Sequence, residues 1–212
     1  MRVGLLGGTF DPIHNGHLRS AEEIWEDFNL DRVIFIPAYL PPHKDEKPVS
    51  EFNHRLEMCR LAIESIPHLS VSDLEMHRKG KSYSIDTLKD FQKSNPGDEI
   101  HFILGMDAFL DVPSWDRFRE LFKLAHFLVV TRPGYPRGPV EEILNEVSPQ
   151  WRYDPRSARY LHPYGYSVYF WETTLLDISS TRIRHYIREG KSISYLMPRR
   201  VENYIYEHGL YR

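Results

Sequence analysis

One segment of eleven residues restricts the fold of this chain more than any other: Gly7-Gly8-Thr9-Phe10-Asp11-Pro12-Ile13-His14-Asn15-Gly16-His17. An apolar run at residues 3–6 precedes it and predicts a first β-strand, which the two glycines end. Apolar residues at helical spacing follow it, at Leu18, Ala21, Trp25 and Phe28. The segment therefore predicts a tight turn that leads from a strand directly into a helix.

The two histidines of this segment stand three residues apart, where the predicted helix begins. Residues at i and i+3 share one face of a helix, so His14 and His17 point the same way. The first backbone N–H groups of a helix have no intrahelical acceptor, and the helix dipole there favours negative charge. The pattern predicts a phosphate site to which both histidines add hydrogen-bond donors. There are two alternatives: a glycine turn with two surface histidines, and half of a metal site.

This segment resembles the phosphate-binding signature of the nucleotidyltransferase superfamily of α/β folds, Gly-x-Phe-Asp-Pro-x-His-x-Gly-His. It is not a dinucleotide-binding fingerprint, because the glycines fall at 4, 7 and 8, nor a P-loop, because no Gly-Lys-Ser/Thr follows. The resemblance implies attack on the α-phosphorus of a nucleoside triphosphate, with pyrophosphate leaving. It also implies that the turn binds ATP through Gly7, Gly8, Thr9 and Phe10.

Length and composition set the class of protein. The 212 residues, 41% of them apolar, suit one domain, 1–212, with a C-terminal helical subregion at about 178–212. The net charge of −3 argues against broad binding to nucleic acid. Cys59 is the only cysteine, which excludes an internal disulfide and predicts a small buried group. Neither a secretory h-region nor an apolar run of roughly 18 residues occurs, so we expect a cytoplasmic protein without a membrane partner.

Predicted strands and helices alternate along the rest of the chain, which indicates an α/β fold with an open parallel sheet and helices on both faces. A long loop at 37–50 suggests a function, since βα connections usually have about 2–6 residues. In the segment 135–166 we expect a helix at 139–147 and then an aromatic, basic loop. The other predicted strands are 32–36, 69–71, 99–104, 126–130 and 167–172, and the other predicted helices are 52–66, 84–91, 178–188 and 198–208.

A second anion site is predicted where the helix at 178–188 begins. The segment is Ile178-Ser179-Ser180-Thr181-Arg182-Ile183-Arg184. It has three hydroxyl groups, although one is enough to cap a helix. Arg184 follows them, and the forked donors of its guanidinium suit phosphate oxygens. Simple capping is the alternative. The segment is similar to the superfamily's C-terminal triphosphate motif, which implies ATP binding by Ile178, Ser179, Ser180 and Thr181. Two such helix starts, at the carboxyl ends of parallel strands, would hold ATP from two sides.

Three further segments separate the branches of the superfamily: Pro41-Pro42-His43-Lys44, Tyr83-Ser84-Ile85-Asp86-Thr87-Leu88, and Gly105-Met106-Asp107 with Trp115 beyond it. Each also has a plainer interpretation, as a solvated loop, a packed helix and a core aromatic residue. Together, in this order, they resemble the bacterial nicotinate-nucleotide adenylyltransferases, from residue 3 to about residue 208. The family often has Tyr-Thr where this chain has Tyr83-Ser84, which keeps a hydroxyl.

That resemblance implies a Rossmann-like fold and transfer of AMP from ATP to nicotinate mononucleotide in NAD biosynthesis. It implies catalytic roles at the phosphates for His14, His17, Lys44 and Arg184. Mg²⁺ would bridge the triphosphate oxygens, held mostly by substrate and water and by no protein ligand that we would name. Whether the protein forms a homo-oligomer is left open.

The same resemblance implies where the two nucleotides bind. Gly105 and Asp107 would contact ATP, with Asp107 accepting hydrogen bonds from ribose hydroxyls. Ser84, Thr87 and Trp115 would hold the mononucleotide, with the pyridine ring against the tryptophan. Backbone N–H groups near Thr87 and surrounding positive charge would favour the acid ring over the amide.

Other functions remain open at this point. A sister adenylyltransferase would act on nicotinamide mononucleotide or phosphopantetheine, although pantetheine-phosphate enzymes are shorter and lack the segments at 41–44 and 83–88. His14-Asn15-Gly16-His17 is similar to the His-Ile-Gly-His motif of class I aminoacyl-tRNA synthetases, but 212 residues leave no room for a tRNA-binding domain. A nucleotide sensor without turnover is the last alternative, against which both histidines and Arg184 argue.

Overall fold

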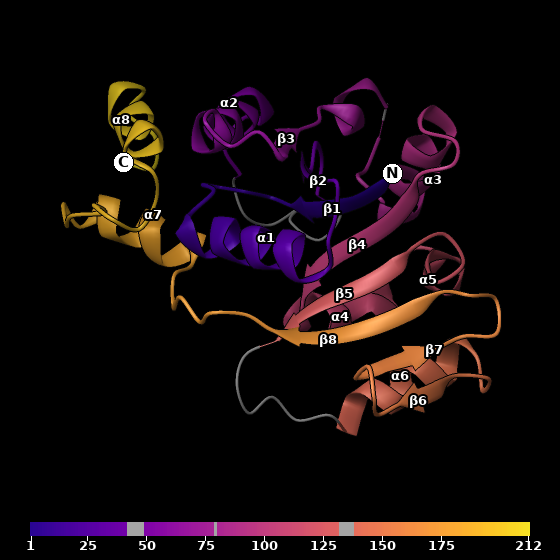
Figure 1. Ribbon diagram of the computed structural model, residues 1–212. Helices are drawn as coiled ribbons and strands as arrows, with labels where there is room; N and C mark the ends of the chain where they lie inside the picture. Colours follow the sequence, from indigo (N-terminus) through magenta and orange to yellow (C-terminus); the bar gives the residue numbers. More distant parts are fainter. Residues whose placement is uncertain (42–48, 79, 132–137) are drawn as a thin grey trace.

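An eight-stranded sheet forms the centre of the structure (Figure 1), in the order β3-β2-β1-β4-β5-β8-β7-β6. The computed structural model describes residues 1–41, 49–78, 80–131 and 138–212. The strands are β1 (Arg2–Gly8), β2 (Arg32–Pro37), β3 (Leu69–Val71), β4 (Glu99–Gly105), β5 (His126–Thr131), β6 (Arg152–Asp154), β7 (Arg159–Leu161) and β8 (Ser167–Glu172).

Helices cover both faces of this sheet, as expected. Neighbouring strand residues point to opposite faces, so Leu5 packs in one apolar cluster and Leu6 in the other. The cluster that contains Leu5 includes residues of α3 (Ser84–Ser94), α4 (Met106–Asp111), α5 (Phe118–Leu121) and α6 (Gly138–Val147). The cluster that contains Leu6 includes residues of α1 (Asn15–Asp27), α2 (Phe52–Ile63), α7 (Ser180–Arg188) and α8 (Arg199–Glu207).

Six strands pair in parallel, and the last two form an antiparallel edge. β8 pairs in parallel with β5, whereas β7 pairs antiparallel with β8 and β6 with β7. The prediction of an aromatic, basic loop after α6 was therefore wrong, because this segment folds back as a hairpin on β8. The two strands have three residues each and mix aromatic with charged side chains, so no apolar alternation marks them. Pairing with β8 stabilises them instead.

The direction of winding changes between β1 and β4. From β1 the chain passes through α1 to β2 on one side, and from β3 it returns through α3 to β4 on the other side of β1. Leu5 consequently pairs with Ile34 on one side and with Phe102 on the other. The chain leaves the carboxyl ends of β1 and β4 in opposite directions, and such a switch point is where an open α/β sheet forms its ligand crevice.

Most predicted elements are confirmed, with differences at their ends. The last helix, α8, has Pro198 as its N-cap, and Gly209 beyond its end has the left-handed φ of 62° that favours glycine. Cys59 is buried, as predicted. The short helices α4 and α5, and the 3₁₀ turns η1 (Leu74–His77) and η2 (Val112–Ser114), were not predicted. Among the described residues, no helix combines the length and the apolar character needed to cross a bilayer.

Candidate active site

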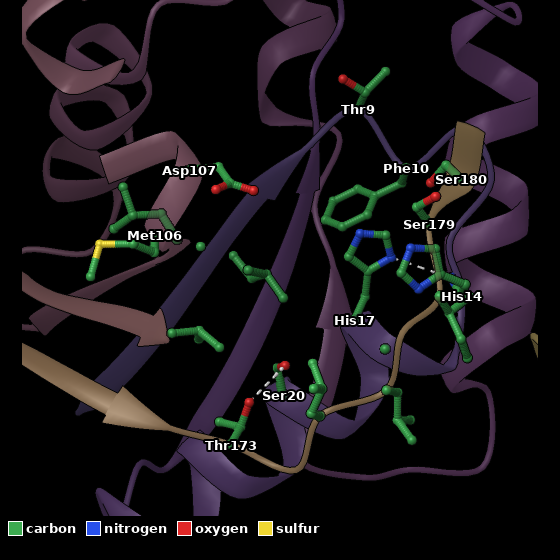
Figure 2. Close-up of a pocket in the computed structure, with 18 of the residues that line it drawn as sticks. Thr9, Phe10, His14, His17, Ser20, Met106, Asp107, Thr173, Ser179 and Ser180 are labelled. Carbon is green, nitrogen blue, oxygen red and sulfur yellow. Dashed lines mark hydrogen bonds between the residues drawn. The ribbon is translucent and has the colours of Figure 1, made fainter. Parts of the chain in front are cut away.

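Two lobes of one crevice open at the carboxyl ends of β1 and β4. The first lobe, drawn in Figure 2, has a volume of about 470 Å³, and the second has about 420 Å³. Thr9, Phe10, His17 and Gly105 line both lobes. The lobes therefore meet at the turn after β1, where His17 faces both of them.

The structure places every described residue of the predicted site in one of these lobes. The first lobe is lined by His14, Asp107, Ile178, Ser179, Ser180, Thr181 and Arg184, in addition to the shared residues. The second lobe is lined by Gly7, Gly8, Ser84, Thr87 and Trp115. Gly7 and Gly8 thus lie on the side of the three mononucleotide residues, although the resemblance implied contact with ATP. Lys44 lies outside the described residues.

The turn after β1 needs its glycine for a steric reason. A Cβ atom on Gly8 would lie 2.9 Å from the ring of Phe10, so a larger residue would displace that ring. Phe10 itself has a left-handed φ of 49°, and its ring meets the edge of the His17 ring at a centroid distance of 5.1 Å. The turn therefore packs an apolar ring directly behind the histidine that both lobes share.

His14 and His17 form one stacked pair at the start of α1. His14 is the N-cap residue, and the two rings lie 3.7 Å apart between centroids. The backbone N–H of His14 donates to Nδ1 of His17 over 3.3 Å, so a neutral His17 carries its proton on Nε2. In His14 the Nδ1 atom is buried without a hydrogen-bond partner in the part of the chain that the structure describes. Buried polar atoms without a partner are uncommon in folded proteins.

Both histidines are uncharged near neutral pH. Burial lowers the pKa of His14 to about 4. Burial and the neighbouring charge of His14 lower the pKa of His17 well below its usual value. A neutral pair of this kind can offer ring N–H donors but not two positive charges.

The start of α7 lies beside the histidine pair on the same side of the first lobe, as Figure 2 shows for Ser179 and Ser180. Ser179 caps the helix, because its hydroxyl accepts the N–H of Arg182 at 3.2 Å. The hydroxyl of Ser180 donates to the carbonyl oxygen of Pro12 at 2.8 Å. Of the three hydroxyls, therefore, only that of Ser179 caps the helix, and that of Ser180 connects α7 to the turn after β1.

Arg184 joins the same two segments. Its Nη1 donates to the carbonyl oxygen of Asp11 at 2.6 Å, and its Nη2 donates to the hydroxyl of Thr181 at 3.3 Å. The carboxylate of Asp11 lies 3.9 Å from the same guanidinium. The guanidinium is thus held at the rim of the first lobe, with its fork anchored to the phosphate-binding turn.

Asp107 stands on the opposite wall of the first lobe from Ser179 and Ser180 (Figure 2). It belongs to the first turn of α4, directly after Gly105 ends β4. A Cβ atom on Gly105 would meet no heavy atom within 4 Å, so the backbone there is open to the crevice. The carboxylate of Asp107 is therefore an acceptor on the side of the lobe opposite the start of α7.

The second lobe is more apolar and holds the tryptophan that the sequence analysis singled out. The Trp115 ring packs edge-on against Phe102 at 6.4 Å between centroids, and its Nε1 donates to Asp111 at 3.3 Å. Thr87 is buried in the floor of the lobe, in α3. Among the described residues that line this lobe there are two acids, Glu75 and Asp116, and no Lys or Arg. The expected positive surroundings therefore do not come from these residues.

Two buried charged residues of the site were missed by the sequence analysis. Arg55, only 1% exposed, donates to the carbonyl oxygens of Thr9 at 2.8 Å and of Ala38 at 2.7 Å. Burial lowers the pKa of Arg55, and the nearby carboxylates oppose this shift. Glu75 lies in η1 and lines the second lobe. No sequence signal distinguished them from the charged residues of a solvent-facing surface.

The described residues offer no ready-made site for a metal ion. No group of three or more His, Cys, Asp or Glu side chains within them could hold one. The acids that line the first lobe are Asp11 and Asp107. A divalent ion at this site would therefore depend on oxygens that the nucleotide brings.

Comparison with known proteins places the fold and this site in a class. A model of the cytidylyltransferase-like family matches residues 5–186, a span that includes the starts of α1 and α7. Fold, crevice and family model thus define a nucleotidyltransferase of the cytidylyltransferase-like class. Two curated relatives, each named probable nicotinate-nucleotide adenylyltransferase, come from Geobacter metallireducens (49% identical) and Geotalea daltonii (46% identical). Each alignment covers all of this chain and 98% of the relative. The chain belongs to the nicotinate-nucleotide adenylyltransferase family.

Solved structures agree with this assignment at the level of the fold. Nicotinic acid mononucleotide adenylyltransferase of Plasmodium falciparum, complexed with NaAD, matches with a TM-score of 0.76 at 22% identity. The match covers 99% of this chain and 97% of that chain. A putative nicotinate-nucleotide adenylyltransferase from Vibrio parahaemolyticus matches with a TM-score of 0.64. The full-length match to the curated relatives sets aside the synthetase-fragment alternative.

Proposed function

We propose that the protein transfers AMP from ATP to nicotinate mononucleotide, which yields nicotinate adenine dinucleotide and pyrophosphate for NAD biosynthesis. One observation carries this proposal: two lobes of similar size meet at Phe10, His17 and Gly105. A reaction that joins two nucleotides needs two adjacent sites with their phosphates at the junction. The names of the full-length relatives support the same reaction.

ATP occupies the first lobe in this proposal. The ribose lies against Asp107, and the triphosphate extends toward the start of α7, where Ser179, Ser180 and Thr181 offer N–H and hydroxyl groups. Arg184 exchanges one of its present partners for a phosphate oxygen, since its fork suits such an acceptor. The leaving pyrophosphate is thus held by donors that are already in place.

The chemical step takes place where the lobes meet. A phosphate oxygen of the mononucleotide attacks the α-phosphorus, the bond from that phosphorus to the bridging oxygen breaks, and both electrons of that bond leave with pyrophosphate. The Nε2–H of His17 and the His14 ring donate to oxygens on which charge develops. No protein side chain becomes covalently attached, because positioning and electrostatic stabilisation carry this chemistry.

The mononucleotide occupies the second lobe, with its pyridine ring on Trp115. The first two N–H groups of α3, at Ser84 and Ile85, have no intrahelical acceptor, and they lie at the positive end of the helix dipole. Of the two, Ser84 lines the lobe, so we assign its N–H to the carboxylate of nicotinate, since the described lining offers no Lys or Arg. Selectivity for the acid then depends on backbone groups more than on side-chain charge.

Three further assignments belong to the proposal. Mg²⁺ would enter with ATP and neutralise charge on the triphosphate, and no step above depends on it. Lys44 would add positive charge near the phosphates. We also expect the protein to act in the cytoplasm as a single domain, without nucleic-acid or membrane partners.

ATP labelled at the α-phosphorus tests the reaction. With nicotinate mononucleotide and Mg²⁺, the label is expected in the dinucleotide, with one pyrophosphate formed per dinucleotide and none of the label on the protein. Label that stays in ATP would contradict transfer to nicotinate mononucleotide. Label on the protein would contradict the direct transfer.

A further inference from the structure

Glu75 is a buried carboxylate in the lobe that we assign to the mononucleotide. It is 7% exposed and lines this lobe together with Thr87 and Trp115. The proposed transfer needs no acid here, because both substrates are anions. A buried negative charge beside an anion's site is costly, so its hydrogen bonds must explain its presence.

The two oxygens of Glu75 connect parts of the chain that are far apart in sequence. Oε1 accepts the hydroxyl proton of Thr87 at 2.5 Å, the short end of the range for an O–H group on a carboxylate. Oε2 accepts the backbone N–H of Tyr39 at 3.2 Å. Tyr39 follows β2, and its neighbours Ala38 and Pro41 line the lobe, whereas Thr87 lies in α3. Glu75 therefore joins two walls of the lobe.

The Tyr39 segment is held from its other side by Arg55. The carbonyl oxygen of Tyr39 accepts Nη2 of Arg55 at 3.3 Å, and the same guanidinium holds the carbonyl oxygen of Thr9. Glu75 and Arg55 also attract each other electrostatically, which opposes the lowering of the Arg55 pKa by burial. A continuous set of hydrogen bonds thus runs from the phosphate-binding turn to Thr87.

This arrangement determines what the Thr87 hydroxyl can do. A hydroxyl has one proton, and here it points at Glu75, while the oxygen accepts Nη2 of Arg78 at 3.1 Å. The carbonyl oxygen of Tyr83, at 3.2 Å, is a more distant acceptor for the same proton. Thr87 consequently has no proton to give to a ring carboxylate.

We propose that Glu75 is a positioning residue for the mononucleotide. It fixes the spacing between the Tyr39 segment and α3, and so the shape of the second lobe, and Thr87 serves as its partner and not as a contact to the ring. The inference rests on the proposed function for the identity of the ligand. Because Glu75 acts on the shape of the lobe, its loss should affect acid and amide rings alike.

Glu75→Gln tests this role. Glutamine has one side-chain acceptor oxygen, so either the Thr87 hydroxyl or the Tyr39 N–H loses its partner. The KM for the mononucleotide should rise about tenfold with either ring, which is the size of effect expected when one hydrogen bond to a charged group is lost. The KM for ATP should change less than about twofold. The matched control is His77→Gln, in the same turn but with a 67% exposed side chain, which should leave all three values unchanged.

A double-mutant cycle with Thr87→Val completes the test. If Thr87 acts only through Glu75, the double variant should have a mononucleotide KM no higher than that of the worse single variant. Additive effects, or a Thr87→Val effect confined to the acid ring, would overturn the proposal, because Thr87 would then contact the ring. An equal rise in the KM for ATP would overturn it as well, since the damage would be general.

The same variants separate this inference from the proposed function. Wild-type protein that forms no dinucleotide would refute the proposed function alone. The Glu75–Thr87 link can still be measured then, as a coupling in the free energy of unfolding across the same cycle. Coupling is the expected result, and its absence would refute the link itself.

Discussion

The hydroxyl of Tyr211 donates a hydrogen bond of 2.7 Å to Oδ1 of Asp11, a residue 200 positions earlier in the chain. Asp11 is buried in the phosphate-binding turn, and its carbonyl oxygen accepts Arg184. Burial and the Asp11 charge raise the pKa of Tyr211 far above its usual value, so the tyrosine remains a donor at any ordinary pH. The end of the chain therefore holds the turn on which the phosphate site is built.

Removal of this hydroxyl should weaken both the fold and the ATP site. Tyr211→Phe leaves a buried carboxylate with one donor fewer, which should lower the free energy of unfolding by about 1.5–3 kcal/mol. The KM for ATP should rise more than that for the mononucleotide, because Asp11 and Arg184 line only the first lobe. Denaturant titration and initial rates measure both. Tyr206→Phe, at a 41% exposed position of α8, is the control, and equal effects from the two variants would contradict this account.

The histidine pair should matter to turnover and little to folding. His17→Ala should lower kcat by roughly 10²–10³-fold, as expected when one preorganised donor to a developing charge is lost. His14→Ala should act similarly, because the stacked rings share one site. Circular dichroism and thermal melting check that the variants fold. Near-normal turnover in either variant would show that the histidines do not contact the reacting phosphates.

Stability should fall in mild acid because several buried histidines must stay neutral. Burial lowers the pKa of His14 from 6.5 to about 4, and that of His101 from 6.5 to about 4. As pH falls, the unfolded chain binds protons at these sites at a higher pH than the folded chain does. The contribution of these histidines to the free energy of unfolding is therefore complete above pH 6.5 and is lost as pH falls toward 4. Melting temperatures across this range should drop less steeply in His101→Gln than in the exposed-site control His77→Gln. Parallel curves would contradict the assignment.

Arg184→Lys separates a phosphate contact from a purely structural one. Lysine keeps the charge but loses the planar fork, so the KM for ATP should rise more than the KM for the mononucleotide. Initial rates at varied concentrations of each substrate measure the two values. Equal changes in both would instead mean that the substitution disturbs both lobes and that the arginine makes no selective contact with the phosphates of ATP.

Local sequence was enough to predict where the residues that we propose bind phosphate lie in the fold. A phosphate contact of this kind uses backbone N–H groups at a helix start after a glycine turn, and all of these are encoded within a few residues. His14, His17 and Ser179 therefore took their expected places at two helix starts. The parallel pairing of most strands, but not their order in the sheet, also followed from the alternation of elements, because βα units build parallel sheets.

Long-range burial was not predictable in the same way. Arg55 lies in α2 between residues whose charges suggest a solvated face, and it becomes buried only when the chain after β2 folds over it. Glu75 gains its partners from two distant segments, at Tyr39 and Thr87. The β6–β7 hairpin was not predicted for a related reason, since its register is set by pairing of β7 with β8. In each case the deciding contact comes from elsewhere in the chain.

Trp115→Ala separates ring stacking from acid recognition. A ring face contributes stacking worth about 0.5–1.5 kcal/mol beyond its buried area, but it cannot tell a carboxylate from an amide. The variant should therefore lower kcat/KM for both mononucleotides and leave much of their ratio unchanged. Loss of the preference in this variant would place acid recognition at the tryptophan and not at the start of α3.

The ratio of kcat/KM for nicotinate mononucleotide to that for nicotinamide mononucleotide tests the central claim most directly. Both substrates would be assayed with ATP and Mg²⁺ by dinucleotide formation. The N–H groups at the start of α3 match a carboxylate and are poorly matched by an amide, so the ratio should exceed about ten. A ratio near one, or one that favours the amide, would contradict the assignment of the acid as substrate and leave only the adenylyl transfer chemistry.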